Sequence, residues 1–559
     1  MAVISGARAL VEALEKRRVK VIFGIPGGAM LDICEALANS SIRTILTRHE
    51  QCAAHAADGY ARASGKVGVC MATSGPGATN LVTGIATAYM DSSPIVALTG
   101  QVPRRLIGRD AFQEADIIGI TCPITKHNFQ VERASDIPLI IDKAFQIASS
   151  CRPGPVLVEI PKDVQTELAD VEADRDPEDA FRQPNHAPHP LQVKRAVELL
   201  AAAERPMIIA GGGVIASNAS QELLAVAELL MAPVATTLMG KGALPENHPL
   251  ATGLLGMHGT VASNKLIQEA DVVLAVGTRF SDRTTGKIDE FCPDAKIIHT
   301  DIDAAEIGKN VEADVPIVAD AKKALQEIYK LLQTKIAKKE RTTLMAKIKE
   351  FKEQLDGKAN CESELKPPRL MVQIRQLLPE DAIITTEVGQ NQMWAAIYLK
   401  VYKPRTFISS GGLGTMGFGF PASLGAKVAH PKVPVVDIAG DGSFIMTEQN
   451  LATSVEENIP VTVVVLNNSV LGMVAQWQRL FYNRRYFAVN LGRVPDFIKL
   501  AEAYGAQGFC VKSLEEFSSA LKKAITSEVT TVIDVPISPE ENVLPMVPPG
   551  KGLKWMIWK

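Results

Sequence analysis

Cysteine is scarce in this sequence, and the few cysteines are scattered. Only 8 occur in 559 residues, and no two have the C-x-x-C spacing that is typical of zinc sites. Small secreted scaffolds, by contrast, are dense in cysteine because disulfides replace a core. The composition therefore argues against structural zinc and against a disulfide framework, and it indicates a reducing compartment.

Long hydrophobic runs are also missing. No window holds the roughly 18 uncharged apolar residues that a membrane helix needs. The first residues, "MAVISGARALVEALEKRRVK", are typical of an amphipathic helix and lack the apolar core of a signal peptide. We expect a cytoplasmic protein, or an organellar one after removal of a transit peptide.

An excess of either charge is absent, since the net charge is −3. This balance gives neither a basic face for nucleic acid nor a polybasic membrane patch. What is present is a globular composition, with 47% hydrophobic residues. At this length one core is not enough, and roughly three or four domains are expected.

Short β-branched runs alternate with helical patterns along the whole chain. Examples are "VIFGIPG", "IVALTG", "VVLAVG", "VVDIAGDG" and "VTVVVLNN", and nearly every run ends in Gly, Asn or Asp. This alternation predicts the α/β class, with three doubly wound parallel sheets whose strand ends face ligands.

Two shifts in composition divide the chain into domains. Residues 166–189 are charged and contain prolines, and residues 333–368 are rich in Lys and Glu, so both are predicted to be linkers. The predicted domains are 1–165, 190–332 and 369–540. The tail, 541–559, is too apolar to be free and is expected to pack on the rest.

A carboxylate stands between two glycines at the end of the predicted strand "VVDIAG". After Asp441 and Gly442 come 24 residues, and then Asn467 and Asn468 at the end of the next predicted strand. Adjacent parallel strands would bring a carboxylate and an amide to one edge, which suits Mg²⁺. The helix that follows would offer free N–H groups to a pyrophosphate. Taken alone, Gly-Asp-Gly would only indicate a tight turn.

Together these two motifs resemble the cofactor-binding motif of thiamine diphosphate (ThDP)-dependent enzymes. The resemblance implies that Asp441, Asn468 and the backbone carbonyl of Val470 bind Mg²⁺. It also requires a carboxylic acid beside the pyrimidine ring of the cofactor. Glu50, which follows the strand-like "IRTIL" and opens an Ala-rich helix, is the best candidate. Taken alone, it would only indicate an acidic residue at a helix N-terminus, where the helix dipole stabilises it.

Other segments match the same family. The ThDP-binding residues that the resemblance implies are Glu50, Pro76, Asn80, Val388, Gly389, Gln390, Asn391, Gly414, Met416, Asp441, Gly442, Ser443 and Asn468. Gly414 would place its carbonyl against the 4′-amino group, and Met416 would support the bent cofactor. Asn391 stands where the family has His, and we expect its amide to donate to phosphate.

Over essentially its full length the chain resembles the catalytic subunits of acetohydroxyacid (acetolactate) synthases. Segments 100–129, 152–163, 236–260, 276–287 and 467–486 carry this resemblance, the last as "NNSVLGMVAQWQRLFYNRRY". It implies decarboxylation of pyruvate through a ThDP enamine. That unit then joins a second pyruvate, giving 2-acetolactate, or 2-ketobutyrate, giving 2-aceto-2-hydroxybutyrate. The three domains would bind the pyrimidine, FAD and the diphosphate, in chain order.

The resemblance also implies a flavin in the central domain, although no GxGxxG fingerprint is present. Its implied FAD-binding residues are Arg152, Gly212, Thr237, Leu238, Gly256, Met257, His258, Gly277, Arg279, Asp282, Arg283, Asp301 and Asp320. Two arginines flanking "FSD" suit a diphosphate. FAD would be structural, with no net redox role.

The substrate-binding residues implied by the resemblance are Phe112, Gln113, Lys162, Arg283 and Trp477. Gln113 and Lys162, from the neighbouring subunit, would join Glu50, Gly414 and Met416 in catalysis, and Trp477 would favour 2-ketobutyrate as acceptor. The expected assembly is a homodimer or a dimer of dimers, with a small regulatory subunit as partner.

Other functions remain open from the residues. One is a FAD-free catabolic acetolactate synthase. Another is a different ThDP enzyme: a 2-ketoacid decarboxylase, a pyruvate oxidase or a glyoxylate carboligase. A third, a non-catalytic nucleotide-binding or regulatory protein, is disfavoured because Glu50, Asp441 and Asn468 are all intact.

Overall fold

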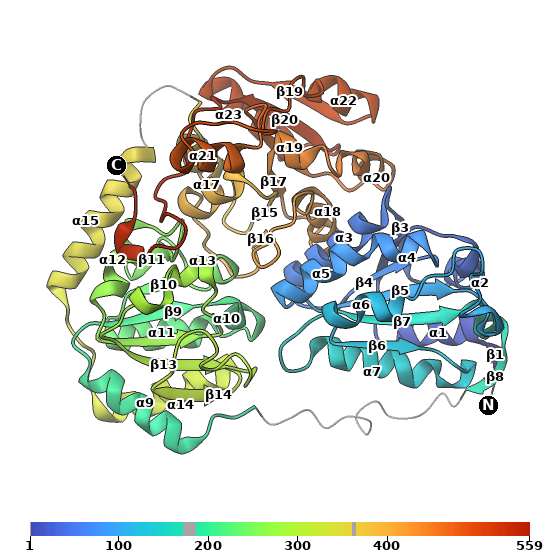
Figure 1. Ribbon diagram of the computed structural model, residues 1–559, viewed down its shortest axis with the longest axis horizontal. Coiled ribbons are helices and arrows are strands. Elements are labelled where there is room, and N and C mark those ends of the chain that lie inside the picture. Colours follow the sequence, from blue (N-terminus) through green and yellow to red (C-terminus); the bar gives the residue numbers. More distant parts are fainter. Residues whose placement is uncertain (1, 172–185, 360–364, 559) are drawn as a thin grey trace.

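The computed structural model describes residues 2–171, 186–359 and 365–558. Three six-stranded sheets dominate it, one within each of the three predicted units, and every strand pair inside these sheets is parallel (Figure 1). The predicted α/β class with parallel sheets is confirmed.

In each sheet the order of the strands in space differs from their order in the chain. From edge to edge, the N-terminal sheet contains β3 (Arg43–Leu46), β2 (Val21–Gly24), β4 (Gly68–Ala72), β5 (Ile95–Gln101), β7 (Val156–Pro161) and β6 (His127–Gln130). The central sheet contains β11 (Ala251–Leu254), β10 (Val234–Thr236), β9 (Pro206–Ala210), β12 (Val272–Val276), β13 (Lys296–Asp301) and β14 (Val315–Val318). The C-terminal sheet contains β16 (Phe407–Ser409), β15 (Ile383–Thr386), β17 (Val435–Gly440), β18 (Thr462–Asn467), β20 (Thr531–Pro536) and β19 (Gln507–Cys510).

Helices connect these strands. In the N-terminal unit they are α1 (Gly6–Lys16), α2 (Leu31–Ala38), α3 (Glu50–Ser64), α4 (Pro76–Asn80), α5 (Val82–Asp91), α6 (Ile117–Thr121), α7 (Ile137–Ser149) and α8 (Lys162–Thr166). In the central unit they are α9 (Pro190–Ala202), α10 (Gly212–Ala216), α11 (Ser220–Leu230), α12 (Val261–Glu269), α13 (Asp282–Thr285) and α14 (Ala321–Lys335). Beyond it follow α15 (Thr342–Ala359), α16 (Pro367–Leu377), α17 (Gln390–Tyr398), α18 (Gly419–Ala429), α19 (Asp441–Phe444), α20 (Leu451–Glu456), α21 (Gly472–Phe481), α22 (Phe497–Ala503) and α23 (Leu514–Ala524).

Both faces of the sheets are covered, which explains why inner strands such as β2 are buried and apolar on both sides. In β2, Val21 and Phe23 join one hydrophobic core while Ile22 joins another on the opposite face. Side chains alternate between the two faces of a strand, so a strand buried on both sides must be continuously apolar.

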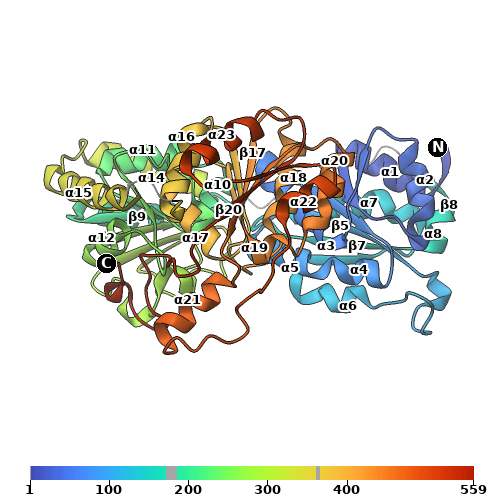
Figure 2. The same ribbon diagram turned by 90° about the horizontal axis from the view of Figure 1, so that it is seen from above.

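The N-terminal and C-terminal units share one core through helices α3 and α18 (Figures 1 and 2). Glycines allow this close packing. A Cβ added at Gly59 would lie 2.1 Å from the carbonyl oxygen of Ala422, and one at Gly425 would lie 1.8 Å from that of Ala56. Both distances are impossible for a side chain, so the two helix backbones touch where only glycine fits.

The segments predicted as linkers contain secondary structure. The short strand β8 (Leu168–Val171) pairs antiparallel with β1 (Ala2–Ser5). Residues 172–185 and 360–364, parts of the two predicted linkers, lie outside the described residues. The helix α15 occupies half of the second segment.

The C-terminal tail packs on the central unit. The amide of Val547 donates to the carbonyl of Met257 at 2.7 Å, and Leu553 is buried beside α12. The tail also contacts α21, because the amide of Val543 donates to Oε1 of Gln476 at 2.8 Å. No helix within the described ranges combines the length and apolar character needed to cross a bilayer.

Candidate active site

Asp441 lies at the carboxyl end of the C-terminal sheet, where it begins α19 directly after β17. Strand β18 is the parallel neighbour of β17, with Gly440 paired to Leu466. Asn467 and Asn468 therefore follow at the same edge. The parallel register brings together two motifs that stand far apart in the sequence.

One carboxylate oxygen of Asp441 has no partner. The side chain is almost fully buried, and backbone N–H groups of Gly442, Ser469 and Asn468 stabilise its charge. Its Oδ2 is nevertheless buried without any hydrogen bond. Burial raises the pKa of Asp441 to about 6. A bound cation would remove this cost, so the site fits a metal ion.

Asn468 supplies a fixed amide beside this carboxylate. Its Nδ2 donates to Oε1 of Gln390 at 3.2 Å, and its Oδ1 accepts the backbone amide of Val470 at 3.2 Å. Val470 forms an isolated β-bridge with Asn490. In this bridge the amide of Leu491 donates to the carbonyl of Ser469, and the amide of Leu471 donates to the carbonyl of Val489. Thus the side chain of Asn468 is held in one orientation by both of its polar atoms.

No cluster of three His, Cys, Asp or Glu side chains that could hold a metal occurs in the part of the chain that the structure describes. A cation at Asp441 would need amide, carbonyl and ligand oxygens to complete its shell. Mg²⁺ tolerates such a sparse protein contribution because it shares oxygens with water and phosphate.

The segment 388–391 lies beside Asp441 but differs in one respect from expectation. Asn391 donates its amide to the carbonyls of Glu387 at 2.9 Å and Ile438 at 2.7 Å. Both of its hydrogens are used by the main chain, so neither is left for the expected donation to phosphate. Its Oδ1 instead faces Gly389 and Gly440. Asn391 thus braces the strand ends.

The glycine-rich segment with Gly414 and Met416 adjoins the same edge. Gly414 has a φ of +72°, which favours glycine, and a Cβ added there would meet no atom within 4 Å. Ser443, which follows Gly442 in α19, donates to Oε2 of Glu387 at 2.5 Å, and the amide of Gly417 donates to the same oxygen at 2.8 Å.

Glu50 belongs to a second group of predicted residues in the N-terminal unit. It is the first residue of α3, and Asn80 donates to its Oε2 at 2.9 Å. Asn80 ends α4, which begins at Pro76. Gln113 joins them, since a Cβ at Gly75 would lie 2.8 Å from its carbonyl oxygen. Four predicted residues of one domain are thereby assembled.

The structure does not join the two groups within one chain. Among the described residues, no hydrogen bond or ion pair connects Glu50 or Asn80 with Asp441 or Asn468. Likewise Lys162 pairs with Asp32 at 2.5 Å, and Phe112 is 88% exposed. These two predicted substrate residues contact neither Trp477 nor Arg283 through such bonds.

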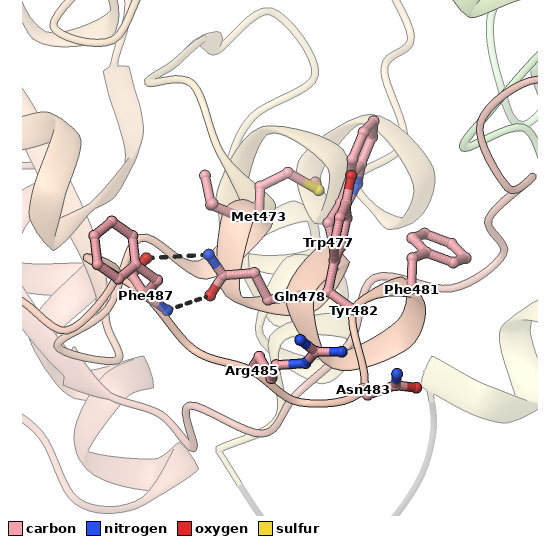
Figure 3. Close-up of a pocket in the computed structure, with 9 residues that line it drawn as sticks. Met473, Trp477, Gln478, Phe481, Tyr482, Asn483, Arg485 and Phe487 are labelled. Carbon is pink, nitrogen blue, oxygen red and sulfur yellow. Dashed lines mark hydrogen bonds between the residues drawn. The ribbon is translucent and has the colours of Figure 1, made fainter.

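Trp477 and Arg283, by contrast, lie together beside an apolar cavity. The guanidinium of Arg283 is 6.0 Å from the ring centre of Trp477. The cavity, of about 740 Å³, is lined by Met473, Val474, Trp477, Gln478, Phe481, Tyr482, Asn483, Arg485 and Phe487 (Figure 3). Two hydrogen bonds between the Gln478 side chain and the Phe487 backbone close one side of it (Figure 3). Sequence reasoning missed Tyr482 and Phe487, although the aromatic residues of "WQRLFYNRRYF" were a usable signal.

The predicted flavin residues of the central unit gather at the carboxyl ends of its strands. Gly212 follows β9, Thr237 and Leu238 follow β10, Gly256, Met257 and His258 follow β11, Gly277, Arg279, Asp282 and Arg283 follow β12, Asp301 ends β13, and Asp320 follows β14. Parallel strands point the same way, so these residues meet at one edge of the sheet. That edge is where such folds bind ligands.

Electrostatics at this edge suit an anionic ligand. Arg279 is largely buried, and burial lowers its pKa, followed by the nearby charge of Arg152. Arg152 comes from the N-terminal unit and pairs with Glu306 at 2.7 Å. Two guanidinium groups close to one another fit a diphosphate, which can accept from both. The donor set therefore fits a dinucleotide such as FAD.

Two other side chains at this edge carry costs of burial. Burial lowers the pKa of His258 to about 4, while its Nδ1 lies 3.2 Å from the carbonyl of Pro545. Burial raises the pKa of Asp301 to about 6. His258 is therefore neutral near pH 7. Asp301, which accepts the backbone amide of Asp303 at 2.9 Å, is ionised there at an energetic cost, and such a perturbed carboxylate is a candidate for ligand binding.

Three descriptions of one protein family match successive parts of the chain. They are "Thiamine pyrophosphate enzyme, N-terminal TPP binding domain" over residues 4–120, "central domain" over 193–328 and "C-terminal TPP binding domain" over 387–535. The three matched ranges contain Glu50, the central strand ends and Asp441, respectively.

Individual relatives are similar over nearly their full length. A probable acetolactate synthase large subunit of Methanocaldococcus jannaschii is 54% identical, covering 98% of this chain and 94% of the relative. The acetolactate synthase of Mycobacterium bovis is 48% identical over 98% of this chain and 90% of its own length. The acetolactate synthase isozyme 3 large subunit of Escherichia coli is 45% identical over 100% and 99%.

Proposed function

This chain belongs to the thiamine pyrophosphate enzymes, and among them to the acetolactate synthase large subunits, and we propose that it catalyses the following reaction. It decarboxylates pyruvate and transfers the two-carbon unit to a second 2-ketoacid. Pyruvate as acceptor gives 2-acetolactate, and 2-ketobutyrate gives 2-aceto-2-hydroxybutyrate. These products lead to branched-chain amino acids.

The observation that carries this proposal is the unpartnered Oδ2 of Asp441 beside the fixed amide of Asn468. These two side chains and the carbonyl of Val470 would hold Mg²⁺, and the metal would hold the diphosphate. The N-terminus of α19, with Gly442 and Ser443, offers further N–H groups. When bound, thiamine diphosphate supplies the nucleophilic carbon and the electron sink for decarboxylation.

Glu50 has the role of holding a proton. The side-chain amide of Asn80 donates a hydrogen bond to Oε2 of Glu50, while Oε1 faces the small residue Gly77. That oxygen is free to carry the proton that the pyrimidine ring nitrogen needs. Gly414 and Met416 orient the cofactor, and Asn391 braces the strand ends from behind.

We further propose that residues 1–165 bind the pyrimidine, residues 190–332 bind FAD and residues 369–540 bind the diphosphate. The largely buried Arg279 at the central strand ends, with the charge of Arg152 nearby, supports FAD. Glu50 and the metal site at Asp441 belong to different domains, which supports an active site shared by two subunits. In a homodimer, Phe112, Gln113 and Lys162 of one chain would face Trp477 and Arg283 of the other.

A small regulatory subunit is proposed as a further partner. The support is the naming of the relatives, several of which are called large subunits.

The test is a product assay with pyruvate in which ThDP, Mg²⁺ and FAD are omitted one at a time. We expect acetolactate from the complete mixture and none without ThDP or Mg²⁺. Acetaldehyde, acetyl phosphate or tartronate semialdehyde as the main product would point to another ThDP enzyme. A colourless protein that FAD does not activate would identify a FAD-free synthase.

A further inference from the structure

The glycine-rich segment 411–420 follows β16 and extends into the first turn of α18, and it is anchored at both ends by buried carboxylates. One anchor comes from the N-terminal unit and the other from the C-terminal unit. Neither was singled out in the sequence, because an isolated Asp or Glu carries no motif.

Asp91, the last residue of α5, holds the beginning of the segment. Its Oδ1 accepts the backbone amide of Gly412 at 2.6 Å, and its Oδ2 accepts that of Gly411 at 3.1 Å. The side chain is fully buried. Two backbone N–H groups thus depend on one carboxylate that lies more than 300 positions earlier in the chain.

Arg62 holds Asp91 in place. Its guanidinium pairs with Asp91 at 2.8 Å and with Asp58 at 2.7 Å, and it donates to the carbonyl of Ser409 at 2.7 Å. The hydroxyl of Thr87 adds a further link, lying 2.7 Å from that of Thr415. A buried ion-pair network of the N-terminal unit is therefore bonded to the strand end before the segment.

Glu387 holds the end of the segment. Its Oε2 accepts the amide of Gly417 and the hydroxyl of Ser443, and its Oε1 accepts the amide of Phe420 at 2.9 Å. Every one of these partners donates to Glu387. Burial raises the pKa of Glu387, and burial followed by the charge of Glu387 raises the pKa of Asp437 well above its usual range.

Between the two anchors the segment turns away from the protein. Leu413 is 46% exposed, and Gly414 has open space around its Cα. A short arc with fixed ends has few conformations left, since each anchored N–H restricts the neighbouring dihedral angles. The positions of Gly414 and Met416 therefore depend on the anchors more than on contacts of their own.

We propose that Asp91 and Glu387 are positioning residues which together set the place of Gly414 and Met416 against the cofactor. This inference rests on the proposed function. It adds that the N-terminal unit of a chain shapes the cofactor-binding segment of the same chain's C-terminal unit.

The test uses the full-length holoenzyme with Asp91→Asn and Glu387→Gln. Each change keeps the shape but replaces an accepting oxygen by a donor, so one anchored N–H loses its partner. We expect kcat to fall about 10- to 100-fold while KM for pyruvate changes less than about threefold. ThDP binding without substrate, measured by calorimetry in Mg²⁺, should weaken about fivefold or more.

Glu246→Gln is the matched control. Glu246 is a buried carboxylate that also accepts a backbone amide from another unit, that of Val401, but it does not touch the segment. It should lower the unfolding temperature while kcat and ThDP affinity, measured well below that temperature, stay within about twofold. If Asp91→Asn does not fold, Gly412→Ala replaces it, because its Cβ would lie 2.9 Å from Oδ1 of Asp91 and push the segment off its anchor.

Variants of both anchors with kcat and ThDP affinity within about twofold of the unchanged enzyme would overturn the proposal. Equal losses in the Glu246→Gln control would overturn it too, because they would reveal a general stability effect. A failure of the proposed function would look different, since the unchanged protein itself would then form no acetolactate.

Discussion

The side-chain amide of Asn468 donates a hydrogen bond to Oε1 of Gln390, with 3.2 Å between the two atoms. Its neighbour Asn467 donates instead to Oδ1 of Asp534, at 3.0 Å, on the adjacent strand β20. Two identical residues, adjacent in sequence, thus have different surroundings. This difference makes them a matched pair for testing the metal site.

Asn468→Ala should raise the Mg²⁺ concentration for half-maximal activity about tenfold or more, because it removes a proposed ligand oxygen. Asn467→Ala should leave that concentration nearly unchanged and only lower stability. The measurement is a Mg²⁺ titration of acetolactate formation after treatment with chelator. Equal shifts in both variants would show that Asn468 is not a ligand.

Glu50→Gln should lower kcat about 100-fold or more, because a carboxamide cannot deliver the proton that a carboxylic acid can. Asn80 can still donate to the remaining oxygen, so folding should be retained. His49→Asn is the control, since His49 caps α3 by accepting the amide of Gln51, and Asn caps as well. Activity that survives Glu50→Gln within a few fold would remove Glu50 from the mechanism.

Trp477→Leu should shift the products toward 2-acetolactate when pyruvate and 2-ketobutyrate compete. A smaller side chain widens the cavity and weakens the preference for the larger acceptor, by about 5- to 10-fold in the product ratio. Phe481→Leu is the comparison, because Phe481 packs edge-on against Trp477 with 6.3 Å between ring centres. Chromatography of the two acetohydroxyacids gives the ratio, and an unchanged ratio in Trp477→Leu would contradict the assignment.

Asp301→Asn should stabilise the FAD-free protein at pH 7.5 and not at pH 4. Burial raises the pKa of Asp301 from its ordinary 3.8 to about 6. The folded state therefore holds the proton more tightly than the unfolded state, and this contribution to stability is present below pH 3.8 and lost as the pH rises through 6. Above about pH 6 the buried charge costs about 3 kcal/mol, which the amide avoids.

Thermal unfolding of both proteins at the two pH values measures this difference. FAD binding should weaken in the variant if the carboxylate serves the flavin. A stability gain that is the same at pH 4 and pH 7.5 would mean that the charge of Asp301 is not its source.

Much of this protein was determined by its sequence alone. Uninterrupted apolar runs ending in Gly, Asn or Asp predict parallel sheets covered on both faces, because a strand buried on two sides tolerates no alternation. Asp441 and Asn468 could be paired in advance, since neighbouring parallel strands end at one edge. Such relations follow from local pattern and chain order.

Only the tertiary structure decided which partner each polar side chain takes. It turned the amide of Asn391 toward the carbonyls of Glu387 and Ile438, away from the expected phosphate. It also placed the carboxylate of Asp91 where it accepts the amides of Gly411 and Gly412, and it left Oδ2 of Asp441 without a hydrogen-bond partner. Hydrogen bonds depend on distances of a few tenths of an ångström between atoms that chain order does not relate, so a sequence pattern carries no record of them.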